Sequence, residues 1–221
     1  MDLSVLDAST DEQFDCFEQY LPSPRVYDVQ ENEFPEDPDA VIVTGSKHGV
    51  YEDQPWIQPL LEKIREYVEA GIPLLGVCFG HQAIAKAFGG EIRCMGEYEI
   101  GYRKVWLEDS PIFRGLSGVE RPFITHQDEV SEVPGDFTEI ASNDVCLHGI
   151  EHRERDVFGV QFHPEYDMEY TERVIKRKDF TENRTRELIE QVHGENHRKA
   201  ERTKKVLKNF IHTASGNSGP H

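Results

Sequence analysis

A cysteine between two glycines is the residue of this chain whose setting best suits catalysis. The segment Gly76-Val77-Cys78-Phe79-Gly80 fits the pattern G-x-C-x-G, the thiol form of the nucleophile elbow. Flanking glycines permit the tight turn that projects such a side chain, and a helix start beside it favours the thiolate, the reactive form. A lone cysteine after an apolar strand is more often a small core residue, so catalysis requires a partner base.

A candidate base lies far downstream in the segment Gly159-Val160-Gln161-Phe162-His163-Pro164-Glu165. A thiol nucleophile needs a base within hydrogen-bond reach, and the base needs a third group that sets its tautomer and orientation. Alternating strand geometry can aim His163 and Glu165 to the same side, and Pro164 stiffens the link. His-Pro-Glu alone is a weak signal, but with the elbow it predicts a Cys-His-Glu triad.

The elements that must position these residues alternate between short apolar runs and amphipathic helices. The run from Pro73 to Val77 predicts a central parallel strand, and 79–88 predicts a helix that ends at Gly89-Gly90, which places Cys78 at a strand-to-helix turn. Further strands are expected at 3–6 and 39–46, and further helices at 11–20 and from Pro55 to Gly71.

The middle and end of the chain complete the predicted fold. Five β-like segments are expected in the middle region: 103–107, 122–125, 138–141, 146–151 and 157–161. The tail from Met168 should be helical, with Val206, Leu207 and Phe210 docking on the sheet. We predict one α/β domain over 1–213, doubly wound and flavodoxin-like, with a mostly parallel sheet, helices on both faces and a small β-rich insertion. Residues 214–221 should form a frayed tail.

The charge of the chain excludes several partners. The sequence has 221 residues and a formal net charge of -18, with acidic residues spread along its whole length. Nucleic acid and anionic membranes both require clustered Lys and Arg, so neither is expected to bind. Self-repulsion at this charge destabilises a compact state unless salt screens it, which suggests a salt-rich cytoplasm. No apolar run has the length of a membrane span, and the N-terminus lacks a basic signal-peptide region, so we expect a cytoplasmic protein.

Other reactive residues have simpler explanations. The four cysteines never form a C-x-x-C pair, which argues against a zinc site and a disulfide scaffold, and Cys94 and Cys146 are expected to be buried or idle thiols. His193 and His197 have the spacing of a helical metal pair, but without a third ligand a solvated charged face is expected. The sequence contains no P-loop pattern, so ATP-dependent activation would fall to another polypeptide. Neither a cofactor nor a metal is expected.

Four ordered blocks resemble the class I glutamine amidotransferases, especially GMP synthase-like stand-alone members. The blocks are Val43-Thr44-Gly45-Ser46, Gly76-Val77-Cys78-Phe79-Gly80-His81-Gln82, Thr125-His126-Gln127-Asp128-Glu129-Val130 and Gly159 through Glu165. The resemblance implies a triad of Cys78, His163 and Glu165. It also implies an oxyanion hole of backbone N–H groups at Gly45, Ser46 and Phe79, and glutamine contacts at Gln82, Thr125, His126, Gln127 and Asp128. His81 is expected to shape the helix start, while His126 could equally line the pocket or satisfy a loop hydrogen bond.

One departure from the family pattern leaves the substrate open. Many members have Gly-Gly-Pro where this chain has Gly45-Ser46-Lys47, and similar turns occur in γ-glutamyl peptidases. The leading interpretation is a glutaminase that releases ammonia for a separate ATP-dependent synthetase. A γ-glutamyl peptidase or amide hydrolase with the same triad is the nearest alternative, and a non-catalytic regulatory or binding module is an alternative of another class.

Overall fold

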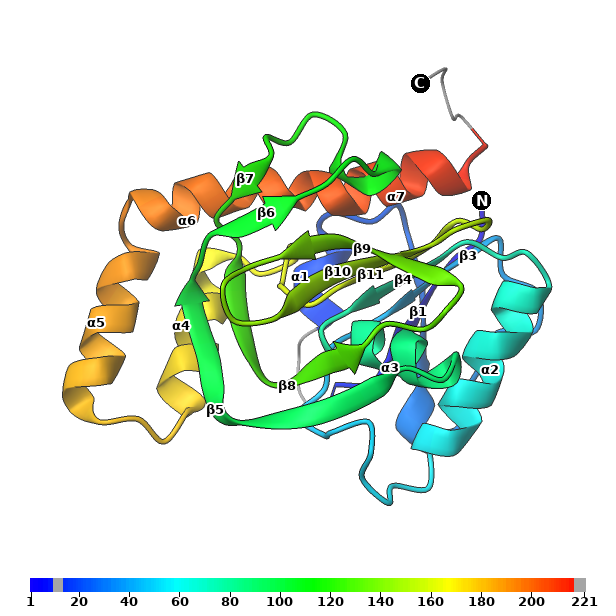
Figure 1. Ribbon diagram of the computed structural model, residues 1–221, viewed down its shortest axis with the longest axis horizontal. Helices are drawn as coiled ribbons and strands as arrows, with labels where there is room; N and C mark the ends of the chain where they lie inside the picture. Colours follow the sequence, from blue (N-terminus) through cyan, green and yellow to red (C-terminus); the bar gives the residue numbers. More distant parts are fainter. Residues whose placement is uncertain (10–13, 217–221) are drawn as a thin grey trace.

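A nine-stranded twisted sheet forms the centre of the computed structural model, which describes residues 1–9 and 14–216 (Figure 1). In spatial order the strands are β2 (Arg25–Asp28), β1 (Leu3–Asp7), β3 (Ala40–Val43), β4 (Leu74–Val77), β11 (Val157–Val160), β10 (Leu147–His152), β9 (Phe137–Ser142), β6 (Val105–Leu107) and β7 (Val119–Glu120). Strands β2 to β11 of this order run parallel, and the remaining strands pair antiparallel. This is the mostly parallel sheet that the sequence predicted.

The parallel pairing of β4 with β11 brings the G-x-C-x-G and His-Pro-Glu motifs together at the carboxyl ends of these two strands. Gly76 is in register with Gly159, and Val77 with Val160, so both strands end at the same level. The backbone N–H of Cys78 continues the ladder by donating to the carbonyl of Val160 at 2.8 Å. Segments more than eighty residues apart in the sequence therefore leave the sheet side by side.

Helices cover both faces of the sheet, because the buried strands place apolar side chains on both faces. Val41 and Val43 pack into one cluster with α2 (Ile57–Glu69) and α3 (Phe79–Ala87), whereas Ile42 points into the other. That second cluster includes side chains of α1 (Phe14–Glu18) and α7 (Lys205–Ala214). The predicted docking of the last helix is confirmed, since Val206, Leu207 and Phe210 are fully buried there.

A second, two-stranded sheet makes up the expected β-rich insertion. Its long antiparallel strands are β5 (Glu91–Tyr102) and β8 (Phe123–Glu132), which curve beside the main sheet (Figure 1). A third apolar cluster joins them to α4 (Met168–Arg177), α5 (Glu182–Val192) and α6 (Glu195–Ala200). Three short 3₁₀ turns complete the described elements: η1 (Val29–Glu31), η2 (Pro111–Phe113) and η3 (Glu201–Lys204).

Two of the predicted segments lie partly outside the described residues. The helix expected at 11–20 is seen only as Phe14–Glu18, and residues 10–13 are not described. Of the predicted C-terminal tail, Ala214 still belongs to α7 and 217–221 are not described. Among the described helices, none is both long and apolar enough to cross a bilayer.

Candidate active site

Cys78 occupies a strained turn between β4 and α3. Its φ of 54° and ψ of -102° lie in a region that residues with a side chain rarely adopt. The neighbouring glycines explain how the turn closes. A Cβ atom on Gly76 would collide with the backbone of Gly80, and one on Gly80 would collide with the carbonyl of Val43. The two glycines of the G-x-C-x-G pattern are thus required by close backbone approach.

His163 follows β11, and hydrogen bonds hold both its backbone and its ring. Its backbone N–H donates to the carbonyl of Phe123 at 3.0 Å. Its ring Nδ1 lies 2.8 Å from Oε1 of Glu165, so Nδ1–H donates to the carboxylate. Its Nε2 is buried and has no hydrogen-bond partner within residues 1–9 and 14–216. This geometry leaves Nε2 as the ring nitrogen that can exchange a proton with a group in the pocket.

Electrostatics strongly favour the protonated form of His163. Burial alone would lower its pKa, but the Glu165 carboxylate and the Cys78 sulfur together raise the pKa to about 10. Both negative groups lie close enough to hold a proton on the imidazole once the cysteine has released one. The arrangement therefore suits transfer of a proton from Cys78 to His163.

Two residues without a predicted role contact Cys78 and His163. The ring of Tyr166 stacks on His163 with a centroid separation of 4.1 Å and an interplanar angle of 17°. The side-chain amide of Gln161 donates to Sγ of Cys78 at 3.5 Å. Both residues could have been singled out from the sequence. Gln161 lies two residues before His163, which is the period of a strand, and Tyr166 directly follows Glu165.

Cys78 and His163 open into a common pocket of about 290 Å³. Thr125 also lines it, and its carbonyl lies 4.0 Å from Sγ of Cys78. The pocket is lined by Ser9, Ser46, Lys47, Cys78, Thr125, His163, Tyr166, Tyr170, Val174, Arg177 and Lys178. It therefore combines the cysteine and histidine with aromatic walls and three cationic side chains.

The loop after β3 lies against the first turn of α3. The backbone N–H of Gly80 donates to the carbonyl of Thr44 at 3.1 Å, which brings Gly45 and Ser46 close to Phe79. Gly45 is buried, whereas Ser46 lines the pocket. Backbone N–H groups in the first turn of a helix have no partners within the helix, so Phe79 can offer one to a ligand.

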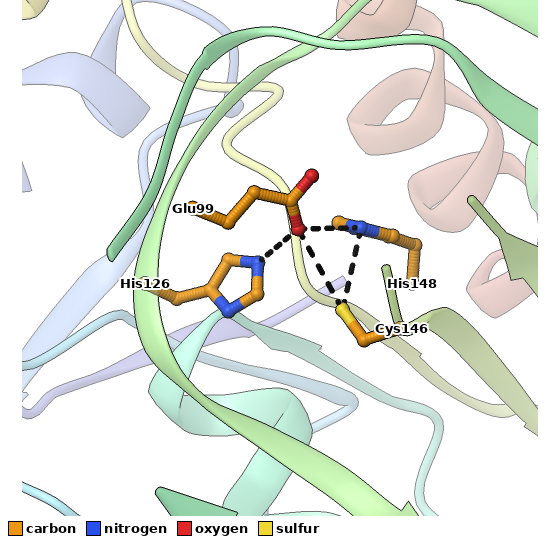
Figure 2. A group of neighbouring side chains, drawn as sticks. All are labelled: Glu99, His126, Cys146 and His148. Carbon is orange, nitrogen blue, oxygen red and sulfur yellow. Dashed lines mark hydrogen bonds and ion pairs between the residues drawn. The ribbon is translucent and has the colours of Figure 1, made fainter. Parts of the chain in front are cut away.

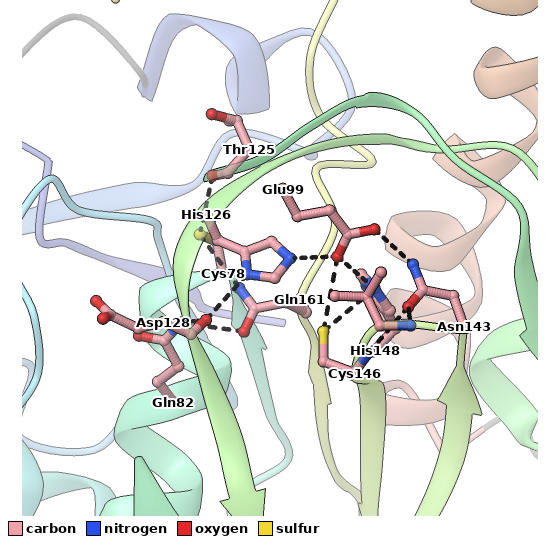
Figure 3. Close-up of polar contacts among 11 residues, drawn as sticks. Cys78, Gln82, Glu99, Thr125, His126, Asp128, Asn143, Cys146, His148 and Gln161 are labelled. Atoms are coloured by element: carbon pink, nitrogen blue, oxygen red, sulfur yellow. Dashed lines mark hydrogen bonds and ion pairs between the residues drawn. The ribbon is translucent and has the colours of Figure 1, made fainter. Parts of the chain in front are cut away.

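Several predicted substrate contacts instead form a buried layer behind Cys78 (Figure 3). Gln82 donates to the carbonyl of Asp128 at 3.1 Å and to Oε1 of Gln161 at 3.0 Å. His126 also donates from Nδ1 to the Asp128 carbonyl, at 2.9 Å. Of the five predicted contacts, only Thr125 is among the described residues that line the pocket, and the side chain of Asp128 accepts from Tyr51 instead. Gln127 lies half-buried on β8.

The structure agrees only in part with what was expected of His81, His193, His197 and Cys146. His81 is fully buried in the first turn of α3 and packs against Gly159, and burial lowers its pKa to about 3, so it stays neutral. The expected solvated face at 193 and 197 is wrong for His197, which is buried and lies 2.8 Å from the hydroxyl of Tyr102. Cys146 is buried, as expected, and its sulfur lies 3.5 Å from Nε2 of His148, whereas Cys94 is exposed.

Comparison with known proteins identifies the family. The sequence matches the family Glutamine amidotransferase class-I over residues 14–183, so the chain belongs to that family. It is 37% identical over 132 residues to the GMP synthase [glutamine-hydrolyzing] of Clostridium novyi, covering 59% of this chain and 25% of the relative. It is 36% identical over 143 residues to that of Vibrio vulnificus, covering 63% and 26%. The chain thus spans about a quarter of these relatives.

Solved structures show the same fold over nearly the whole chain. A glutamine amidotransferase from Thermotoga maritima aligns with a TM-score of 0.79 and 25% identity, covering 97% of this chain and 98% of that one. A putative GMP synthase subunit from Thermoplasma acidophilum aligns with a TM-score of 0.71 and 21% identity, covering 98% and 95%. The expected doubly wound, flavodoxin-like class is confirmed.

Proposed function

We propose that this chain hydrolyses the side-chain amide of glutamine through a thioester on Cys78 and releases ammonia. The observation that carries the proposal is the buried Nε2 of His163, which has no hydrogen-bond partner among the described residues and shares a pocket with the Cys78 sulfur. Membership of the class I glutamine amidotransferases supports the same chemistry.

Each member of the triad has a distinct role in the proposed reaction. Nε2 of His163 takes the Cys78 proton, and the thiolate attacks the amide carbon. Collapse of the tetrahedral intermediate breaks the C–N bond, and His163 donates the proton that the leaving ammonia needs. Water, deprotonated by His163, then attacks the thioester and releases glutamate. Throughout, Glu165 fixes the Nδ1–H tautomer and stabilises the imidazolium.

The tetrahedral intermediate carries a negative oxygen that needs fixed donors. We assign this role to the backbone N–H of Phe79 and to those of Gly45 and Ser46, since the hydrogen bond between Gly80 and Thr44 holds the two segments together. Loss of one such donor costs about 3 kcal/mol in related chemistry.

The pocket rim suits a substrate that carries an α-carboxylate. Lys47 and Lys178 both line it, in a chain whose net charge is -18. Lys178 also lies over the Tyr98 ring at 4.1 Å, which limits where its ammonium can point. These cations would attract the carboxylate shared by glutamine and γ-glutamyl compounds.

We further propose that a separate ATP-dependent synthetase uses the ammonia. The curated relatives are GMP synthases about four times as long as the matched part, and one structural neighbour is named as part of such an enzyme. A cytoplasmic, salt-adapted setting accords with the acidic composition.

Ammonia release from glutamine tests the proposed reaction. Wild-type protein and Cys94→Ala, which removes an exposed thiol, should both release ammonia, whereas Cys78→Ala should not. The measurement should be made with and without the candidate synthetase, because a partner can align such a site. Retained activity in Cys78→Ala would refute the assignment.

A γ-glutamyl peptidase remains the second candidate because of the Gly45-Ser46-Lys47 turn. Both reactions pass through the same thioester, so only products separate them. Glutamine and a γ-glutamyl dipeptide should be supplied separately, with ammonia and free amine measured. Faster release of amine from the dipeptide would favour the peptidase.

A further inference from the structure

Four buried side chains capable of binding a metal meet between the two sheets, away from the substrate pocket (Figure 2). Glu99 and His126 lie directly opposite each other on β5 and β8. Cys146 immediately precedes β10, and His148 lies on that strand. One ligand atom from each residue lies within 4.8 Å of the other three. The group therefore links three strands of two different sheets.

The distances within this group match a tetrahedral ligand shell. With zinc bonds of about 2.1 Å to N or O and about 2.3 Å to S, two N/O ligands lie about 3.4 Å apart, and sulfur lies about 3.6 Å from N or O. Oε2 of Glu99 lies 3.2 Å from Nε2 of His126 and 3.3 Å from Nε2 of His148. The Cys146 sulfur lies 3.7 Å from the same oxygen and 3.5 Å from His148. Small movements of His126 would close the shell.

We propose that Glu99, His126, Cys146 and His148 form a structural binding site for a divalent transition metal ion, of which Zn²⁺ suits the ligands best. Two imidazoles, one thiolate and one carboxylate make a borderline-soft set, which favours zinc over magnesium or calcium. Four protein ligands would leave no open position, as is usual for a structural rather than a catalytic zinc ion.

The tautomer of His126 gives independent support. Its Nδ1 lies 2.9 Å from the carbonyl of Asp128, and because a carbonyl only accepts, Nδ1 must carry the proton. A neutral ring then presents the Nε2 lone pair to an oxygen of Glu99 at 3.2 Å. Two lone pairs repel unless a cation lies between them or the ring takes a second proton. Metal-binding histidines commonly show this arrangement, with the other nitrogen donating to a carbonyl.

A second residue outside the ligand set holds the group in place. Asn143 donates from Nδ2 to Oε1 of Glu99 at 2.6 Å, which leaves Oε2 facing the other three ligands. Its own Oδ1 accepts from the backbone N–H groups of Val145 and Cys146 at 2.8 and 3.0 Å. One side chain thus orients both the carboxylate and the cysteine.

Charge and access are both compatible with a divalent ion. Binding releases the Cys146 thiol proton to water, and the two negative charges of thiolate and carboxylate then balance the ion. Glu99 and Asn143 also line a surface hollow of about 620 Å³, which gives an ion a route to the otherwise buried group.

The ion would brace the wall of the active site without touching substrate. The Asp128 carbonyl accepts from both His126 and Gln82, and Gln82 contacts Gln161, whose amide donates to the Cys78 sulfur (Figure 3). From the sequence alone no metal was expected, because the cysteines form no C-x-x-C pair. The ligands come from three segments that lie far apart in the sequence, with only Cys146 and His148 on the same one.

Metal binding should be tested in the full chain carrying Cys78→Ser, which removes the nucleophilic thiol as a competing ligand. After growth with added zinc and gel filtration, elemental analysis should find about one Zn²⁺ per chain. Replacement by Co²⁺ should give tetrahedral visible bands and a thiolate-to-cobalt charge-transfer band. Further substitution Cys94→Ser should preserve that band, and Cys146→Ser should abolish it.

Two further measurements keep the proposal falsifiable if Cys146→Ser does not fold. In the Cys78→Ser background, Asn143→Ala should weaken Zn²⁺ binding about 10- to 100-fold. X-ray absorption of the zinc-loaded protein should find one sulfur among the ligands. The proposal is overturned by substoichiometric zinc, by a shell of nitrogen and oxygen alone, or by a cobalt band that survives loss of Cys146. None of these readouts depends on glutaminase activity.

Discussion

Replacing Glu165 by glutamine would remove one charge from the triad and keep an acceptor for Nδ1–H of His163. The pKa of His163 is raised from 6.5 to about 10, and the charge of Glu165 is the largest single cause of the rise. The pKa of His163 should therefore fall in the variant, and a fall of one pH unit corresponds to about 1.4 kcal/mol less stabilisation of the imidazolium. If an energy of this order is lost from the imidazolium-like transition state, kcat should fall at least about tenfold.

Nitrogen NMR of labelled histidine measures the pKa directly, and ammonia release measures the rate. Glu169→Gln is the matched control, because that carboxylate on α4 is exposed and pairs with Arg173 rather than with the triad. The control should leave both the pKa of His163 and the rate unchanged. An unaltered pKa of His163 in Glu165→Gln would refute the electrostatic role assigned to the carboxylate, even if activity fell.

Three further perturbations have definite expected outcomes. Gly80→Ala should destabilise the protein by about 3 kcal/mol because its Cβ meets the Val43 carbonyl, whereas Gly135→Ala, with no heavy atom within 4 Å, should change stability by less than about 0.5 kcal/mol; equal denaturation midpoints would contradict this. The raised pKa of His163 stabilises the fold fully below about pH 6.5, and this contribution is lost as pH rises towards about 10; Cys78→Ser removes one cause of the raised pKa, so thermal unfolding across pH should show a smaller loss that is complete at a lower pH in that variant. Stability should rise along a potassium chloride series, because salt screens the repulsion within a chain of net charge -18: the screening length falls from about 30 Å at 0.01 M to about 3 Å at 1 M. A flat profile would count against salt adaptation.

The fold was predictable where local patterns and burial agree. Apolar runs such as Leu74–Val77 predicted buried strands. Gly71 predicted the end of a helix because glycine readily adopts the positive φ found there, and its φ is 79°. Strand β5 was missed because its residues from Glu91 to Tyr98 mix polar and apolar types without a sustained alternation, and most of them are exposed. Its pairing with β8 is a tertiary property that local sequence does not encode.

The candidate site was predictable as far as its motifs reached. Cys78 and His163 were expected to lie close together, and parallel pairing of β4 with β11 explains why both line one pocket. The place of His126 could not be derived from its motif, because the direction of its ring depends on the partner strand that carries Glu99. The neighbours of Cys146 likewise could not be derived from the sequence, because they depend on how β10 packs beside the two-stranded sheet.

Covalent trapping tests the central claim most directly. The glutamine analogue diazo-oxo-norleucine needs a reactive thiolate, so peptide mass spectrometry should find one adduct, on Cys78, in the wild-type protein. His163→Ala should greatly slow its formation, whereas Cys94→Ala should not. Labelling of Cys78 at the same rate without His163, or labelling only at another cysteine, would contradict the account.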